Sequence, residues 1–169
     1  MGSLRLVMLE ECNRTCEGCC NNDWDLEGLQ VVDSFSGYDE ILITGGEPML
    51  YPEKVIDLCN EIAFYSDEYP SVILYTAKTK RPLDLIAVLA VLDGVTITLH
   101  EQYDVEPFNV FNLLSEKLGA GIGRSLRLNV FSGIDISTCN LEGWDVKEDI
   151  EWIKDCPLPE NETIKRLNW

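Results

Sequence analysis

Two kinds of short apolar segment alternate along the whole chain, and this alternation constrains the fold more than any other feature. One kind is a run of branched and apolar residues, typical of a strand; the other places apolar residues at helical spacing. Such alternation predicts a parallel sheet with helical crossovers. The expected strands are residues 4–9, 40–44, 71–76, 95–100, 125–131 and 163–167. The expected helices are residues 25–35, a helix from 52 that stops before 70, and 83–92, 106–118 and 146–155.

The number of these units limits how far the sheet can close. Five or six units are too few for a closed eight-stranded barrel. We therefore expect an α/β fold with a partial, open (β/α) barrel of five to six parallel strands. No repeat or low-complexity tract divides the 169 residues, so one domain over residues 1–169 is expected.

The composition excludes several classes of protein. Hydrophobic residues make up 46% of the chain, which argues against disorder, and no apolar run is long enough to span a membrane. The net charge of -17 repels nucleic acid, so no nucleic-acid partner is expected. Seven cysteines without a secretory signal favour a reducing cytoplasm and argue against a disulfide framework.

Three cysteines follow the first expected strand at spacings of four and three residues: Cys12, Cys16 and Cys19. Thiolates at such spacings bind a soft metal centre. A structural zinc or a fully protein-ligated cluster normally takes four protein ligands. Three ligands would leave one iron of a [4Fe–4S] cluster open to a substrate or cofactor.

A glycine-rich turn, Gly45-Gly46-Glu47-Pro48, follows the second expected strand. Paired glycines let the backbone approach a ligand closely, and the Glu47 carboxylate can accept a hydrogen bond from an ammonium group. Ligands of parallel α/β folds bind at the carboxyl ends of the strands. We therefore expect this turn and the cysteine loop at the same edge of the sheet.

Together the two motifs resemble the C-x3-C-x2-C and GGE signatures of the radical S-adenosylmethionine (SAM) superfamily. The resemblance implies a partial barrel, a [4Fe–4S] cluster on Cys12, Cys16 and Cys19, and SAM chelated by the open iron. It also implies that Gly45, Gly46 and Glu47 hold the methionyl amino group. In such an enzyme SAM is cleaved reductively, and a 5′-deoxyadenosyl radical abstracts hydrogen from a substrate.

Two later strands alternate polar and apolar residues, so each has one polar face. The polar faces carry Thr96, Thr98 and His100 in one strand, and Ser125, Arg127 and Asn129 in the next. We expect the apolar faces to meet the helices and the polar faces to point into the barrel. The resemblance implies SAM contacts late in these strands, with Thr98, His100, Arg127 and Asn129 as candidates. Alternatively, His100 caps a strand end and Arg127 pairs with an internal acid such as Glu47.

The remaining cysteines and a basic cluster belong to no motif. Cys20 adjoins Cys19, and adjacent cysteines seldom bind one cubane, so it is interpreted as a residue of the site edge or core. We expect Cys59, Cys139 and Cys156 to be small buried hydrophobes. The basic residues form either a solvated loop or a docking site for an acidic electron donor or an anionic substrate: Lys78, Lys80 and Arg81.

One branch of the superfamily shares further features with the chain. The form Cys-x-Gly-Cys-x-Asn, with Gly18 as a further cofactor-binding candidate, is similar to the activating enzyme of anaerobic ribonucleotide reductase. The Tyr-Thr-Gly element of that enzyme resembles residues 75–77, whereas its Val-Asp-Gly-x-Phe segment is not matched. The resemblance implies an activase-like oxidoreductase with a protein substrate and an electron donor such as flavodoxin or ferredoxin. The alternatives are a zinc-stabilised binding module and an Fe–S carrier without SAM chemistry.

Overall fold

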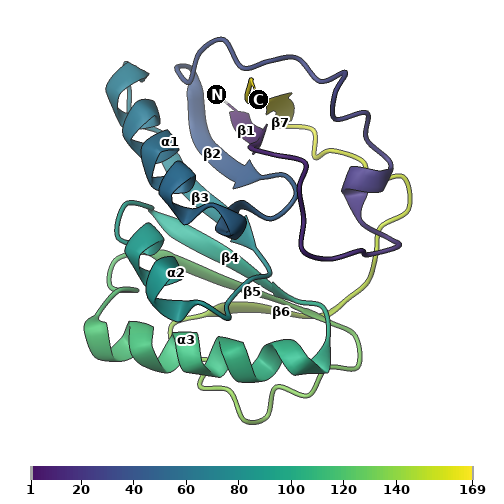
Figure 1. Ribbon diagram of the computed structural model, residues 1–169, viewed down its shortest axis with the longest axis vertical. Coiled ribbons are helices and arrows are strands. Elements are labelled where there is room, and N and C mark those ends of the chain that lie inside the picture. The colour runs from purple at the N-terminus through teal and green to yellow at the C-terminus, as the bar shows by residue number, and fades with distance from the viewer. Residues whose placement is uncertain (1, 169) are drawn as a thin grey trace. The chain divides into compact units, whose positions relative to one another are not determined.

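A computed structural model describes residues 2–168, which form an α/β fold with one all-parallel sheet of seven strands and three α-helices (Figure 1). The strand order is β6-β5-β4-β3-β2-β1-β7. The helices are α1 (Pro52–Tyr65), α2 (Pro82–Leu89) and α3 (Val105–Leu118). The strands are β1 (Gly2–Val7), β2 (Tyr38–Thr44), β3 (Ser71–Thr76), β4 (Gly94–Leu99), β5 (Ser125–Phe131), β6 (Asp145–Ile150) and β7 (Glu162–Arg166).

The chain divides into two compact units. Unit 1 comprises the described part of Met1–Val72 and Trp152–Trp169, and unit 2 comprises Ile73–Glu151. None of the helices in residues 2–168 combines the length and the apolar character that a membrane span requires.

Unit 1 is built on β1, which pairs with β2 on one side and β7 on the other. Leu6 lies opposite Ile43 of β2 and Lys165 of β7. Both Leu6 and Ile43 are fully buried. Helix α1 begins at Pro52, where a missing N–H costs no helical hydrogen bond, and it buries one apolar stripe: Val55, Leu58, Cys59 and Ile62.

Unit 2 contains most of β3 together with β4, β5, β6, α2 and α3. Strand β4 pairs with β3 and with β5, and five of its six residues are buried. Helices α2 and α3 lie side by side in this unit (Figure 1). Phe108 of α3 packs edge-on against Trp144, with ring centroids 5.1 Å apart. Helix α3 ends at Gly119, whose φ of 66° is the left-handed conformation that a helix C-cap favours.

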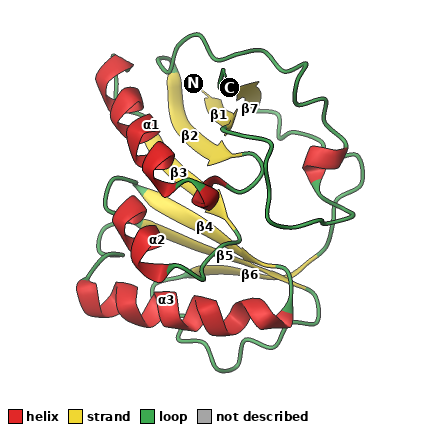
Figure 2. Ribbon diagram, viewed as in Figure 1, coloured by secondary structure: helices red, strands yellow, loops and turns green. Residues whose placement is uncertain are grey.

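The helix expected at residues 25–35 is wrong, because this segment is loop (Figure 2). The Asp25 side chain accepts a hydrogen bond from the Gly28 N–H at 3.1 Å, and this bond closes a local turn where a helix was expected. Beyond that turn, Val31 forms a parallel bridge to Arg166 of β7, and the Val32 N–H donates to the Arg166 carbonyl at 2.8 Å. Pairing with β7 therefore overrides the helical spacing of the apolar residues.

The helix expected at residues 146–155 is also wrong, because its first half is strand β6. This strand raises the count from the expected five or six to seven. A register shift in the pairing of β5 and β6 brings Val146 and Ile150 opposite Leu128 and Phe131. A spacing of four residues fits one face of a helix and also fits a strand with a bulge. The other expected strands and helices are confirmed, with ends that differ by a few residues.

Candidate functional site

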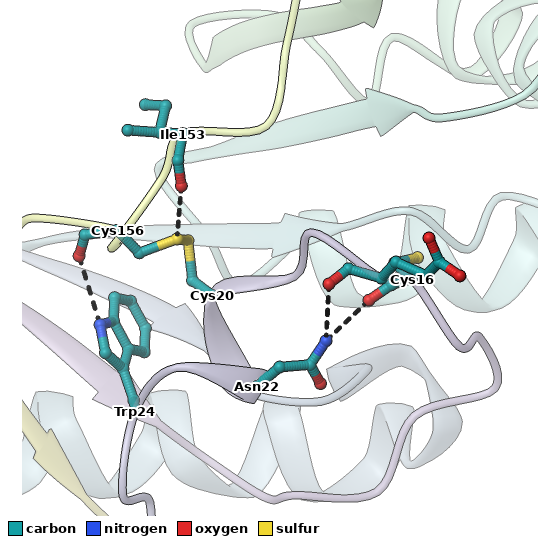
Figure 3. Close-up of a disulfide and its surroundings, with 7 residues drawn as sticks. Cys16, Cys20, Asn22, Trp24, Ile153 and Cys156 are labelled. Carbon is teal, nitrogen blue, oxygen red and sulfur yellow. Dashed lines mark hydrogen bonds between the residues drawn. A yellow bond between two sulfur atoms is a disulfide. The ribbon is translucent and has the colours of Figure 1, made fainter.

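The three cysteines of the motif lie in the loop after β1, within unit 1. They take part in no disulfide; Cys12 is exposed, and Cys16 and Cys19 are half-buried. The Cys19 N–H donates to the Cys16 carbonyl at 3.2 Å and closes a turn. The Asn22 side chain donates to the carbonyls of Cys16 at 2.8 Å and Glu17 at 3.2 Å (Figure 3). Asn22, which the sequence did not single out, therefore fixes the backbone of this loop.

The Gly-Gly-Glu turn after β2 contacts the cysteine loop directly. The Gly46 N–H donates to the Leu9 carbonyl at 2.7 Å, and the Glu47 N–H donates to the Glu11 carbonyl at 2.8 Å. From the other end of the loop, Asn21 Nδ2 donates to the Gly45 carbonyl at 2.7 Å. The expectation that both motifs meet at one edge of the sheet is confirmed within unit 1.

The glycines of the turn are needed for this close approach. A Cβ on Gly46 would lie 1.8 Å from the Glu11 carbonyl oxygen, and Gly45 has a φ of 127°. Neither position accommodates another residue without a shift of the backbone. We expected these glycines to admit a ligand, whereas their nearest neighbour in the structure is the cysteine loop.

Glu47 is buried, with 3% of its surface exposed, at the point where the turn enters a short 3-10 helix, Pro48–Leu50. Its Oε1 accepts the Met49 N–H at 2.9 Å and so caps that helix. The charge of this carboxylate also affects the pKa of Cys12. Although Cys12 as a whole residue is exposed, partial desolvation of its thiol raises the pKa of that thiol. A backbone hydrogen bond from Arg14 opposes the rise in the pKa, and negative charge on Glu47 and Cys19 adds to it.

A disulfide joins the end of the cysteine loop to the C-terminal segment of unit 1. Cys20 is bonded to Cys156, with Cα atoms 5.4 Å apart (Figure 3). Trp24 Nε1 donates to the Cys156 carbonyl at 3.3 Å. The sequence argued against a disulfide framework, whereas the structure has this one bond. Cys156 is buried as expected, but it is disulfide-bonded and not a free thiol. Cys59 is buried as expected, whereas Cys139 is only half-buried.

Gly18 lies where the C-terminal segment covers the cysteine loop. A Cβ on Gly18 would come within 2.2 Å of Trp152 Cγ. The small residue before the third cysteine therefore provides space for an indole ring. Its role in cofactor binding stays a prediction.

The other candidate residues belong to unit 2. Thr96, Arg127 and Asn129 line one cavity, as expected for the polar face of β4 and β5, while Leu128 and Val130 are buried. The His100 N–H donates to Asp104 Oδ2 at 3.0 Å, and the His100 ring stacks on Phe131 with centroids 4.8 Å apart. These contacts fix His100 just after the end of β4, in agreement with the alternative in which His100 caps a strand end. The assignment of Thr98, His100, Arg127 and Asn129 to SAM stays a prediction.

The basic residues after β3 have partners inside unit 2. Arg81 Nε lies 2.6 Å from Asp84 Oδ2, and Lys80 Nζ lies 5.7 Å from the centroid of the Tyr103 ring. The Lys78 N–H donates to Thr76 Oγ1 at 3.0 Å. These contacts fix the loop locally, and a docking role for it stays a prediction.

The donor set of the cysteine loop fits an iron–sulfur cluster chemically, since soft thiolates are the usual ligands of such clusters. Cluster binding requires the thiolate form, so it releases the thiol protons. Within residues 2–168, no three His, Cys, Asp or Glu side chains are placed so that they could hold a single metal ion. In a cubane cluster each thiolate binds a different iron atom.

Comparisons with protein-family models, curated proteins and solved structures found no match to the chain.

Proposed function

We propose that the protein is a radical SAM enzyme. One observation carries the proposal: the cysteine loop and the Gly-Gly-Glu turn are hydrogen-bonded to each other, through the Gly46 and Glu47 N–H groups and the Asn21 side chain. Two motifs that are separated by some 25 residues of loop and strand are thus in direct contact. The proposed site combines three cysteines outside any disulfide with the buried Glu47 carboxylate.

Each part of this site has a role in the proposal. Cys12, Cys16 and Cys19 would hold a [4Fe–4S] cluster and leave its fourth iron for SAM. A cluster with SAM supplies one-electron cleavage of the sulfonium and, through it, hydrogen-atom abstraction. The Glu47 carboxylate and the Gly45–Gly46 backbone would orient the methionyl ammonium group, and Trp152 against Gly18 would limit access of water to the loop.

The wider setting follows from the same chemistry. In this proposal, a single partial-barrel domain receives electrons from a donor such as flavodoxin or ferredoxin. It acts on a protein substrate, as glycyl-radical activases do. A cytoplasmic location would keep the thiolate ligands reduced. In that compartment the Cys20–Cys156 disulfide would be a transient oxidised state.

Anaerobic reconstitution with iron, sulfide, SAM and a reductant tests the proposal. The wild-type chain should turn brown, bind about four iron atoms and produce 5′-deoxyadenosine. Cys16→Ala should lose the intact cluster and the product, because it removes one of three protein ligands. Cys59→Ala, a change at a buried cysteine of α1 outside the motif, should retain both.

Other outcomes point to the alternatives. A colourless protein with one bound zinc would indicate a zinc-stabilised module, and a brown protein that does not bind SAM would indicate an electron carrier. Full cluster content and turnover in Cys16→Ala would refute the ligand assignment.

A further inference from the structure

A polar cavity of about 270 Å³ lies within unit 2, on the face of the sheet that carries Arg127. Its volume is slightly below the range of drug-sized ligand sites and suits a small metabolite. All six lining residues are polar or carry a polar tip: Tyr75, Thr96, Arg127, Asn129, Asp145 and Lys147.

The strand register explains why these side chains meet. Tyr75 of β3 pairs with Thr96 of β4, which pairs with Arg127 of β5, which pairs with Asp145 of β6. This single row therefore crosses four neighbouring strands. Two residues further along β5 and β6, Asn129 pairs with Lys147. Side chains that occupy paired positions on one face are held close together by the backbone ladder, so the site is preorganised.

Thr96 is the feature that indicates a ligand. Its side chain is buried, with 2% exposed, and its Oγ1 has no hydrogen-bond partner among the described residues. A buried hydroxyl without a partner costs free energy, and native proteins rarely leave one. Because Thr96 lines the cavity, a ligand in the cavity could accept or donate the missing hydrogen bond.

The charge of the lining indicates the class of ligand. The whole chain has 30 acidic residues against 13 Lys and Arg, yet this cavity has two cations, Arg127 and Lys147, and one carboxylate, Asp145. Arg127 Nε donates to Ser125 Oγ at 3.1 Å, a contact that orients the guanidinium along the strand. Guanidinium groups bind carboxylates and phosphates with matched geometry, and the Asp145 carboxylate can accept from a hydroxyl or amino group.

We propose that this cavity binds a small organic anion that also carries a hydroxyl or amino group. Arg127 and Lys147 bind the anionic group, Thr96 and Asn129 complete its hydrogen bonds, and Asp145 accepts from the ligand's donor. Arg127 and Asn129, which the family resemblance assigned to SAM, thereby serve a different ligand. The proposal does not depend on the iron–sulfur cluster and is testable on the full chain without one.

The test uses L-malate, a hydroxy acid, as the probe, with binding followed by backbone amide shifts in NMR. Malate should saturate the site and shift the amides of Thr96, Arg127 and Lys147. Arg127→Met should weaken malate binding about tenfold or more, because a hydrogen bond to a charged group is lost. Lys117→Met, a matched change on the exposed side of α3, should leave it unchanged. Absence of saturable shifts at these residues would overturn the proposal.

Two further arms separate this ligand class from others. Inorganic phosphate should bind more weakly than malate; equal affinity would mean that the site senses charge alone, contrary to the role given to Asp145. S-adenosylhomocysteine should not displace malate, and displacement would return Arg127 and Asn129 to the SAM site.

Thr96→Val distinguishes a binding role from a structural one. Valine has the shape of threonine without the hydroxyl, so the ligand-free melting temperature should stay the same or rise while malate affinity falls. A lower melting temperature with unchanged malate affinity would show that the hydroxyl serves the fold, and would overturn its assignment.

Discussion

The Glu47 carboxylate serves two purposes at once in the proposed site. One oxygen already caps the short helix Pro48–Leu50 by accepting the Met49 N–H. The same group is the proposed acceptor for the SAM ammonium. Because a carboxylate has several acceptor positions, one side chain can satisfy both partners. The cap holds the carboxylate in place before SAM binds. The side chain therefore loses less conformational entropy on binding.

Glu47→Gln separates the two purposes. The amide oxygen of glutamine can still accept the Met49 N–H, so the melting temperature should change little. The charge that faces the ammonium is lost, so SAM affinity of the reconstituted protein should fall by roughly ten- to a hundredfold, from a hydrogen bond worth about 1.5–3 kcal/mol. Equilibrium binding of SAM measures the effect.

Glu53→Gln serves as the control, since Glu53 is an exposed acid in the first turn of α1. The SAM affinity of the Glu53→Gln variant should match that of the wild type. If both variants bind SAM as the wild type does, Glu47 is not part of the SAM site.

At the scale of elements, the sequence correctly predicts the strands and helices whose local residue pattern favours the same conformation as their tertiary contacts. Strand β3 and helix α1 are such cases: α1 begins at Pro52, as expected, and β3 begins directly after Pro70. The helices expected at residues 25–35 and 146–155 do not form, because pairing with another strand decides the conformation of both segments. Where such pairing is available, helical spacing of apolar residues is only weak evidence for a helix.

In the candidate site, too, some contacts are predictable from the sequence and others are not. The contact between the two motifs was predictable, because the carboxyl ends of neighbouring parallel strands meet at one edge. The Cys20–Cys156 disulfide was not, since its partners are 136 residues apart and neither lies in a pairing motif. The contribution of Asp145 and Lys147 to the polar cavity was hidden by the expected helix at residues 146–155.

Strand β7 is fixed to the loop before β2 by main-chain pairing and by one ion pair. Lys165 Nζ lies 2.7 Å from Asp33 Oδ1. The hydrogen bond from Lys165 lowers the pKa of the Asp33 carboxyl. Its pKa in the folded chain is thus below its unfolded value, so the pair contributes stability above the unfolded pKa and loses it as the pH falls through the folded pKa.

Lys165→Met should therefore raise the pKa of Asp33 toward its ordinary value. A carbon-detected NMR titration of the Asp33 carboxyl measures this change. The carboxyl of Asp135, whose pKa is lowered by a hydrogen bond from the Ser137 backbone, provides the internal control and should not move. An unchanged Asp33 titration would mean that the ion pair does not form in solution.

At the scale of the whole chain, the disulfide is the feature with the clearest chemical readout. Seven cysteines less one bonded pair leave five thiols. Alkylation of the unfolded, unreduced chain should label five cysteines, and alkylation after reduction should label seven, as counted by mass spectrometry.

The same bond should contribute to stability. Cys156→Ser should lower the unfolding free energy of the oxidised protein by about 2–4 kcal/mol, because it opens a long covalent loop. In a reducing buffer the variant and the wild type should become nearly equal. Cys139→Ser, at a half-buried cysteine outside the disulfide, should show no such dependence on reductant. Seven labelled cysteines without reduction would show that the bond is not formed.

The place of β1 between β2 and β7 has a consequence for how the chain reaches its native state. The pairing of Ser3 with Glu162 joins strands from opposite ends of the sequence. Because such a contact closes a long loop, its entropy cost makes this pairing slow to form. Until β7 arrives, one side of β1 presents unpaired N–H and C=O groups beside the apolar side chains of Leu4 and Leu6, and such an exposed strand edge recruits other chains. Nascent or truncated chains that lack β7 should therefore aggregate through this edge, so expression at low temperature with a holding chaperone should increase the soluble yield.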